Sequence, residues 1–181
     1  KIASWNINSV RIRQDVMQEF VSKYDPDIIC LQETKVEDKL FPLTAMQDLG
    51  FEHIYYSGQK SYNGVAIISK IKADAEFKLI LCHDDKRHIA IKIGDIELHN
   101  FYAPAGGDEP DPEINPKFKH KLQYLDAIYK WFNDNRQPQN KMIMLGDLNI
   151  APYEHDVWSS KQLRNVVSHT DIERNKLLRN M

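Results

Sequence analysis

Several polar side chains lie at the ends of apolar segments, and their types suit the binding of a hard cation. Glu33 ends one such segment, Asp147 ends another, and Asn149 lies two residues further on. Asn6 lies near the end of the first apolar segment. Mg²⁺ takes oxygen ligands, usually one or two carboxylates together with waters and substrate phosphate oxygens. These four side chains supply such oxygens and predict a cation site at the rim of a sheet.

Each of these residues also has a simpler interpretation, which the sequence alone leaves open. Asp147 and Asn149 could shape a turn, because Asp and Asn side chains hydrogen-bond their own backbone. Glu33 could be an exposed charge at the end of a strand, and Asn6 could cap a helix that begins near Val10. Spacing along the chain does not show whether the four side chains meet.

The apolar segments that carry these residues are typical of short strands. Alternation with a period of two predicts that Leu31 and Glu33 lie on one side of a strand, as do Leu145, Asp147 and Asn149. Enrichment in Ile, Val, Phe and Tyr, or alternating polarity, predicts strands at residues 2–7, 27–32, 51–57, 64–69, 75–82, 88–93, 96–102 and 142–146.

Helical periodicity is clear in two places. The stripes consist of Val16, Met17, Phe20, Val21 and Tyr24, and of Phe118, Leu122, Leu125, Ile128 and Phe132. Such stripes face a core. We predict further helices after Pro42 and from Asp171 to Leu178. Helices between groups of strands indicate an α/β layered fold, and five strand segments without a helix in residues 51–102 indicate a largely antiparallel sheet.

Composition limits the class of protein. The 181 residues, 42% of them hydrophobic, suit one domain with a substantial core. No segment approaches the roughly 20 apolar residues that span a membrane, and the first residues do not resemble a secretion signal. Cys30 and Cys82 each lie in an apolar run, which favours two buried, reduced thiols in a cytoplasmic protein.

The order of several motifs gives the chain a specific resemblance. LQETK together with GDLN is a specific pair, whereas GD-x-N alone is weak. The chain resembles the exonuclease III-type abasic-site DNA endonucleases of the endonuclease/exonuclease/phosphatase superfamily along nearly its whole length. The motifs are SWNIN near the start, LQETK at 31–35, KVEDKLFP at 35–42, NGVAIIS at 63–69, HNFYAPAGG at 99–107 and GDLNIAP at 146–152.

The resemblance implies a role for each matching residue. Glu33 matches a metal-ligand glutamate, and Asn6 matches an asparagine that contacts metal or phosphate. Asp147 matches an aspartate that activates the attacking water or binds metal. Asn149 matches an asparagine that steadies the phosphate oxygens, and Tyr102 matches a tyrosine that touches the phosphate. The implied catalytic set is Tyr102, Asp147 and Asn149, and the implied metal set is Asn6, Glu33, Asp147 and Asn149.

The resemblance also implies a fold and an activity. The fold would be a four-layered α/β sandwich of the deoxyribonuclease/exonuclease III type. The implied enzyme is a monomeric DNA-repair hydrolase that requires Mg²⁺ or Mn²⁺ and acts on double-stranded DNA. It would cleave the phosphodiester 5′ to abasic sites and remove nucleotides or blocking groups from 3′ ends. Alternatives are a general deoxyribonuclease, a sugar or lipid phosphatase of the same superfamily, and an inactive DNA-binding fragment.

The chain departs from the family pattern in two places. Ala105 stands where relatives often carry Gln or Asn. The family's later segment, which ends in Ser-Asp-His, has no match, and we expect His155 and His169 to be surface residues. We therefore expect residues 1–181 to be one C-terminally truncated domain that holds the first sheet and its helices without the partner sheet. Such a piece would be inactive in isolation.

The charge of the chain bears only weakly on DNA binding. A net charge of −2 lacks the basic excess usual for a duplex partner, but a metal-dependent nuclease also concentrates carboxylates. Most residues of the local basic clusters are expected to be solvated: Arg11 with Arg13, residues 86–88, and Lys117, Lys119, His120 and Lys121. The candidates for DNA contacts are Arg11, Arg87, Lys117 and Lys119.

Overall fold

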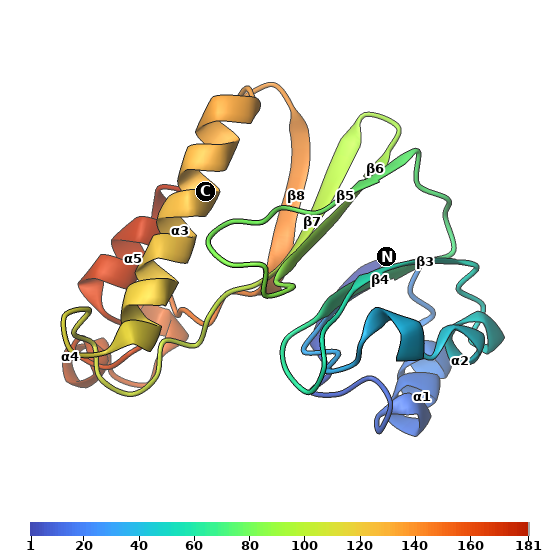
Figure 1. The fold of residues 1–181 in the computed structure, drawn as a ribbon, viewed down its shortest axis with the longest axis horizontal. Helices are drawn as coiled ribbons and strands as arrows, with labels where there is room; N and C mark the ends of the chain where they lie inside the picture. The colour runs from blue at the N-terminus through green and yellow to red at the C-terminus, as the bar shows by residue number, and fades with distance from the viewer. Residues whose placement is uncertain (181) are drawn as a thin grey trace. The chain divides into compact units, whose positions relative to one another are not determined.

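The computed structural model describes residues 1–180, and their contacts divide the chain into two units. Unit 1 consists of residues 1–80, 84–102 and 139–147. Unit 2 consists of residues 81–83 and 103–138 and of the chain from Leu148 onward. Figure 1 shows the elements of both units, and each unit is described by itself.

The first sheet of unit 1 has the strand order β1-β2-β4-β3. β1 and β2 run parallel, and the other two pairs are antiparallel. The strands are β1 (Ile2–Asn6), β2 (Ile28–Gln32), β3 (His53–Ser57) and β4 (Val65–Ser69). Helices α1 (Gln14–Tyr24) and α2 (Leu43–Asp48) cover one face, with the short helix η1 (Asp38–Leu40) nearby in the chain. Met17 and Met46 bring these helices into one core with Ile29, Leu31, Ala66 and Ile68.

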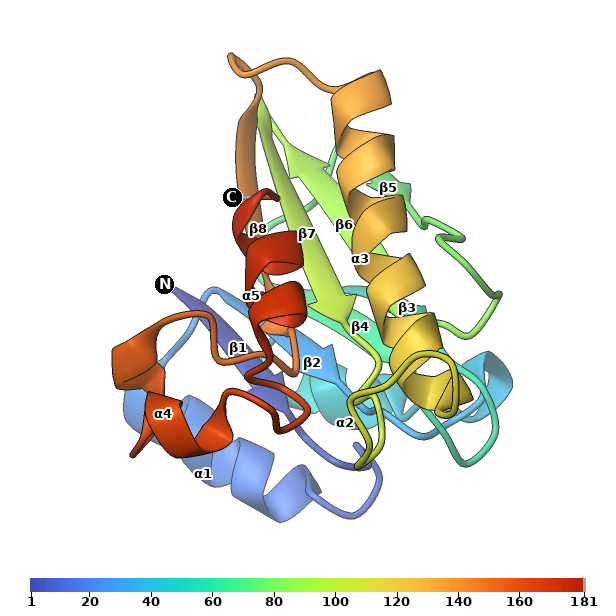
Figure 2. The same cartoon turned by 90° about the vertical axis from the view of Figure 1, so that its left-hand side faces the viewer.

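The second sheet of unit 1 has the order β5-β6-β7-β8 (Figure 2). β7 and β8 are parallel, and the other pairs are antiparallel. The strands are β5 (Ala75–Phe77), β6 (His88–Ile93), β7 (Ile96–Tyr102) and β8 (Lys141–Asp147). This sheet packs on the other face of the first one, through a core of Ile28, Cys30, Val65, Ile67, Ile89, Ile91 and Leu98.

The expectation of one sheet without a partner was wrong. The strands between residues 51 and 102 belong to two sheets, because the chain crosses from one sheet to the other between β4 and β5. No helix marks this crossing, so neighbouring strand segments looked like one continuous sheet. The face that the sequence seemed to leave uncovered is packed against the second sheet.

Most predicted elements are confirmed. All eight predicted strands and all four predicted helices are present, and antiparallel pairs outnumber parallel ones. β5 is shorter than predicted and ends at Phe77. The helices that the sequence did not predict are η1, η2 (Glu154–Asp156) and α4 (Ser160–Leu163). Three or four residues are too few to show a helical period.

Unit 2 is built mainly from α3 (Pro116–Asn135) and α5 (Asp171–Leu178), which lie side by side (Figures 1 and 2). Asn115 caps the N-terminus of α3, and its side chain accepts hydrogen bonds from two backbone amides of the first turn. α5 begins with a capping box between Thr170 and Glu173. Asp126 of α3 forms an ion pair of 2.5 Å with Lys176 of α5.

Cys30 and Cys82 are both reduced, as predicted. Cys30 is buried, and its burial raises the pKa of the thiol to about 12. Cys82 is half-buried, so the prediction that this thiol is buried was wrong. No helix among residues 1–180 combines the length and the apolar character needed to cross a membrane.

Gly146 allows β8 to approach β7 closely just before Asp147. It pairs with Phe101 and has φ +134°, a conformation that favours glycine. A Cβ atom at this position would lie 2.0 Å from the carbonyl oxygen of Phe101. The glycine of the GDLN motif is therefore required by the backbone and not only by the loop that follows.

We expect Gly146→Ala to lower the free energy of unfolding of the full-length protein by about 3 kcal/mol, through backbone strain and the clash with Phe101. Gly94→Ala is the matched control, because Gly94 also has a positive φ but has no neighbouring atom within 4 Å of an added Cβ. The control should cost about 1–2 kcal/mol. Urea denaturation measures both, and equal losses would contradict the steric explanation.

Candidate active site

The site in unit 1 lies where four strands end. β1 and β2 are parallel, and so are β7 and β8, so each pair brings its carboxyl ends to one edge of its sheet. Asn6 is the last residue of β1, Tyr102 the last of β7 and Asp147 the last of β8. Glu33 directly follows β2. The ends of the two sheets therefore supply four of the five predicted catalytic and metal-binding residues.

Hydrogen bonds join these four side chains. Nδ2 of Asn6 donates to Oε1 of Glu33 at 2.8 Å and to Oδ2 of Asp147 at 2.7 Å. The hydroxyl of Tyr102 donates to Oε1 of Glu33 at 2.9 Å. One amide group thus links a carboxylate at the end of the first sheet to a carboxylate of the second.

Glu33 reaches this cluster because it leaves the strand conformation. β2 ends at Gln32, and Glu33 has φ +55°. The prediction that Glu33 shares a side with Leu31 was wrong: Leu31 packs in the core beneath the helices, whereas Glu33 bonds Tyr102 of the second sheet. The strand period fails at the left-handed residue. A non-glycine residue with positive φ is costly and is common at functional sites.

The surroundings of Glu33 hold its carboxylate in the charged form. Burial raises the pKa, but hydrogen bonds from Asn6, Lys35 and Tyr102 together outweigh burial, and the pKa lies below its ordinary value. Nζ of Lys35 lies 2.8 Å from Oε2 of Glu33. The side chain of Glu33 is 19% exposed, so the alternative of a solvated strand-end charge was wrong.

Tyr102 is held as a neutral hydrogen-bond donor. Its burial, followed by its hydrogen bond to the Glu33 carboxylate, raises the pKa of the phenol to about 12. The guanidinium of Arg87 lies 4.8 Å from the centre of the Tyr102 ring, and its Nη1 donates to the Tyr102 carbonyl at 3.2 Å. Arg87 therefore fixes both the ring and the backbone of Tyr102 and places a positive charge beside it.

A pair of buried amide side chains that the sequence analysis did not identify, Gln32 and Asn100, forms a polar bridge between the two sheets. Nε2 of Gln32 donates to Oδ1 of Asn100 at 2.7 Å, and Nδ2 of Asn100 donates to the carbonyls of Leu31 and Ala66 at 2.9 and 3.0 Å. Both side chains are buried. The bridge fixes β7 against β2 and β4, one residue before Glu33 and two before Tyr102. An amide side chain in the middle of an apolar strand was the signal that could have identified it.

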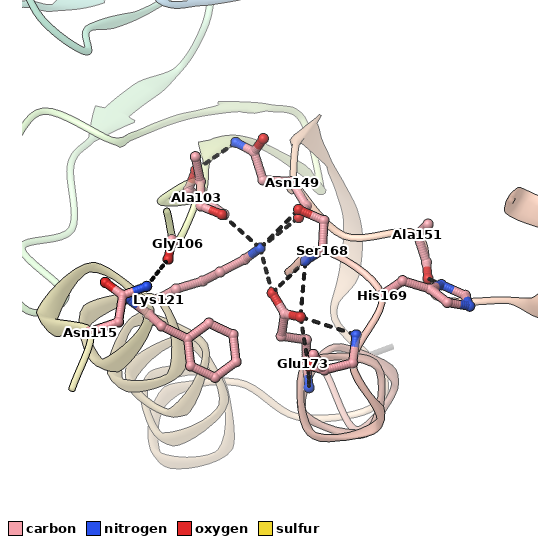
Figure 3. A network of polar contacts seen from close by, with 12 residues as sticks. Ala103, Gly106, Asn115, Lys121, Asn149, Ala151, Ser168, His169 and Glu173 are labelled. Atoms are coloured by element: carbon pink, nitrogen blue, oxygen red, sulfur yellow. Dashed lines mark hydrogen bonds and ion pairs between the residues drawn. The ribbon is translucent and has the colours of Figure 1, made fainter. Parts of the chain in front are cut away.

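Asn149, the fifth predicted residue, belongs to unit 2 (Figure 3). It has φ +52°, and its Nδ2 donates to the carbonyl of Ala103 at 2.9 Å. Its own carbonyl accepts a hydrogen bond of 2.7 Å from Nζ of Lys121. The backbone of Asn149 is thus held by α3, and its side chain is held by the loop that follows β7.

The alternative role for Asn6 as a helix cap was wrong. α1 begins at Gln14, and its N-cap is Arg13. Oδ1 of Asn6 accepts a hydrogen bond from the backbone amide of Asn8 at 3.2 Å. The nitrogen of the Asn6 amide, rather than its oxygen, faces the two carboxylates.

The structure also locates the remaining charged candidates. Arg11, Lys117 and Lys119 are exposed, as predicted for solvated or DNA-contacting side chains. Lys121, from the same basic run, is 0% exposed, so its assignment to a solvated face was wrong. The ring of His169 is buried between the carbonyl of Ala151 and Oγ of Ser160, which corrects the expectation of a surface histidine.

The other histidine expected at the surface is His155, and its side chain is 82% exposed. His88, in the second basic cluster, is buried beside His99 in the second sheet, with 3.1 Å between Nε2 of His88 and Nδ1 of His99. Burial lowers the pKa of His88 well below its ordinary value, so His88 contributes no positive charge to a DNA-binding surface near neutral pH.

The donor set of the site fits a small divalent cation. Glu33 and Asp147 supply carboxylate oxygens that are brought together by one amide, and Glu33 is ionised at neutral pH. Among residues 1–180, no group of three or more His, Cys, Asp or Glu side chains is placed to hold a metal. Two carboxylates suit Mg²⁺, which keeps several waters and also binds substrate phosphates. They are too few for a metal site built from protein ligands alone.

Comparisons with known proteins identify the family and the fold. The Endonuclease/Exonuclease/phosphatase family profile matches residues 3–173. The exodeoxyribonuclease III of Haemophilus influenzae is 28% identical over 169 residues, which are 87% of this chain and 60% of that protein. An AP endonuclease structure from Archaeoglobus fulgidus has a TM-score of 0.87 and 31% identity, over 99% of this chain and 68% of that one.

A third relative is a 3′ phosphatase from Neisseria, whose structure was determined with a product DNA hairpin. It has a TM-score of 0.88 and 31% identity, over 99% of this chain and 69% of that one. The α/β fold is that of these exonuclease III-type relatives, which confirms the predicted fold class. The chain belongs to the Endonuclease/Exonuclease/phosphatase family. It spans 60% of the length of the Haemophilus protein.

We expect Asn100→Leu to lower the free energy of unfolding of the full-length protein by about 3 kcal/mol. The substitution removes the shortest hydrogen bond of the Gln32 amide, at 2.7 Å, and removes the buried donor to two carbonyls. Chemical denaturation measures the loss. A change below about 1 kcal/mol would show that the bridge contributes little more than an average hydrogen bond.

Proposed function

We propose that the protein is a DNA-repair hydrolase that cleaves the phosphodiester 5′ to abasic sites and trims the 3′ ends of duplex DNA. The observation that carries the proposal is the Asn6 amide that holds Glu33 and Asp147 together beside Tyr102. This arrangement suits a reaction at a phosphate, and the family relatives act in the same chemical class.

The carboxylates are the proposed metal ligands. The nucleases of this family depend on a divalent metal, and we propose Mg²⁺ or Mn²⁺ at Glu33 and Asp147. When bound, the metal supplies charge stabilisation for the phosphate and its leaving oxygen. Asn6 keeps both carboxylates in place. The Asn6 amide nitrogen is a proposed donor to the phosphate, and the amide of Asn149 is an additional proposed contact of the metal or the phosphate. Asp147 orients the attacking water.

Hydrogen-bond donors would complete the proposed phosphate site. Tyr102 keeps its proton, so it donates to an oxygen rather than accepting a proton during the reaction. Asn149 steadies the phosphate oxygens as charge develops on them, which is the main way that fixed donors lower a barrier. Arg87 adds positive charge next to Tyr102.

Duplex DNA is the proposed partner, and the enzyme acts as a monomer. Arg11, Lys117 and Lys119 are exposed and can neutralise backbone phosphates, which would make binding salt-dependent. An abasic sugar costs less to extrude from the duplex than a paired nucleotide does, so selectivity would follow from acceptance of an extrahelical sugar.

Removal of a 3′ phosphate is the second candidate activity. The chain is 31% identical to the Neisseria 3′ phosphatase and also 31% identical to the AP endonuclease. This equal identity favours the second candidate. Rates on an abasic duplex, a 3′-phosphate duplex, an intact duplex and a phospholipid separate the candidates. Abasic cleavage as the fastest reaction supports the proposal. Faster hydrolysis of the phospholipid or of intact DNA would contradict it.

Glu33→Gln should lower kcat/KM on the abasic duplex roughly 100-fold at limiting Mg²⁺, because it removes a ligand charge while keeping the shape of the side chain. Raised Mg²⁺ should restore part of the activity. Glu37→Gln is the matched control, since the Glu37 carboxylate pairs with Lys39, which is not a residue of the site. Unchanged activity of Glu33→Gln at limiting metal would rule out the ligand role.

Tyr102→Phe should lower kcat about 10-fold, since it removes one donor from the site. Deprotonation would remove the same donor, but the raised pKa of about 12 keeps the phenol protonated from neutral to moderately alkaline pH. The ratio of wild-type to variant kcat should therefore be equal at about pH 7 and about pH 9. A ratio that falls toward one at the higher pH would show that Tyr102 titrates in that range.

A further inference from the structure

Unit 2 contains a fully buried ion pair between α3 and α5 (Figure 3). Nζ of Lys121 lies 2.6 Å from Oε1 of Glu173, and both side chains are 0% exposed. Removing two charges from water is unfavourable, and apolar side chains of similar size often stabilise a fold equally well. A role beyond stability would account for the charges.

The ammonium of Lys121 also holds three loop segments. It donates to the carbonyl of Asn149 at 2.7 Å, to the carbonyl of Ala105 at 3.1 Å and to Oγ of Ser168 at 3.3 Å. Ala105 and Asn149 lie in the loops that follow β7 and β8, the two strands that end on Tyr102 and Asp147. One buried cation therefore holds both loops.

Glu173 fixes the third segment and keeps the ammonium in place. Its two carboxylate oxygens accept hydrogen bonds from the backbone amide of Ser168, each at 3.0 Å. Oε2 also accepts from the amide of Thr170 at 3.1 Å and from the Thr170 hydroxyl at 2.6 Å. The carboxylate thus has a full set of partners besides Lys121, and its position does not depend on the cation alone.

Asn149 is the residue most constrained by this arrangement. It has φ +52°, a left-handed conformation that costs a non-glycine residue free energy. Its carbonyl is held by Lys121, and its side-chain Nδ2 is held by the carbonyl of Ala103. With the backbone fixed on one side and the amide nitrogen on the other, the direction of the side-chain oxygen is set as well.

We propose that Lys121, paired with Glu173, is a positioning residue that holds Asn149 in the orientation needed to contact the phosphate. The inference rests on the proposed function, in which Asn149 steadies the phosphate oxygens. Lys121 does not touch the substrate. Its effect passes through the Asn149 backbone, and a displacement of a reacting or binding group by about 1 Å can lower a rate by roughly 100-fold.

A simpler role would be to link α3 to α5. A second ion-pair cluster already provides such a link, since Asp126 of α3 pairs with Lys176 and Arg179 of α5. Within residues 1–180, the hydrogen bonds of this cluster join Asp126 to Lys176 and Arg179 and do not involve Asn149. Asp126→Asn therefore weakens the link between the helices without disturbing the Asn149 loop, and it is the matched control.

The test uses the double substitution Lys121→Met with Glu173→Gln in the full-length protein. It removes both charges together, so no unpaired charge stays buried, and Gln can still accept from the Ser168 and Thr170 amides. We expect kcat on the abasic duplex to fall roughly 30-fold while KM changes less than about twofold. Asp126→Asn should keep kcat within about twofold. Equal losses in the two variants would overturn the proposal.

A double-mutant cycle with Asn149→Ala separates positioning from general destabilisation. If Lys121 acts through Asn149, the Lys121 and Glu173 substitutions should cause no further fall of kcat in the Asn149→Ala background. Losses that multiply would overturn the proposal. If the double variant does not fold, Glu173→Gln alone keeps the shape of the side chain and should lower kcat about threefold, again only when Asn149 is present.

The outcomes also distinguish this inference from the proposed function. Absence of metal-dependent abasic cleavage by the wild-type protein would reject the proposed function. An active wild-type protein that loses activity on Asn149→Ala, but not on the paired Lys121 and Glu173 substitutions, would reject only the positioning role.

Discussion

The geometry of the site depends on the short hydrogen bonds from one amide group to two carboxylates that belong to different sheets. Asn6 donates to Glu33 and to Asp147, and these like charges would otherwise repel each other across the junction of the sheets. A divalent cation is the natural counter-charge for such a pair. Tyr102 and Lys35 add further donors to Glu33, which keeps its carboxylate ionised and ready to serve as a ligand.

The rest of unit 1 makes that contact possible. Parallel pairing of β1 with β2 and of β7 with β8 brings the strand ends together at the edges of the two sheets. The buried hydrogen bond between Gln32 and Asn100 joins the two sheets just before Glu33 and Tyr102 in the chain. Gly146 lets β8 run close to β7 immediately before Asp147. Each device lies within two residues of a side chain that it positions.

Much of this could be predicted from the sequence, because apolar periodicity is a local property. The eight strands, the four longer helices and the polar residues at strand ends follow from it. Sheet membership does not, since the crossing between β4 and β5 has no helix to mark it. The side on which Glu33 lies was missed because a left-handed residue breaks the strand period. The burial of Lys121 was missed because its partner, Glu173, lies far along the chain, and spacing alone does not show which residues meet.

The most direct test of the account is the location of a bound cation in the full-length protein, measured by anomalous diffraction from crystals grown with Mn²⁺ in place of Mg²⁺. The account predicts a manganese peak that contacts the Glu33 carboxylate on the side that faces Asp147. A protein that cleaves abasic DNA with Mn²⁺ while its manganese peaks lie away from both carboxylates would contradict it.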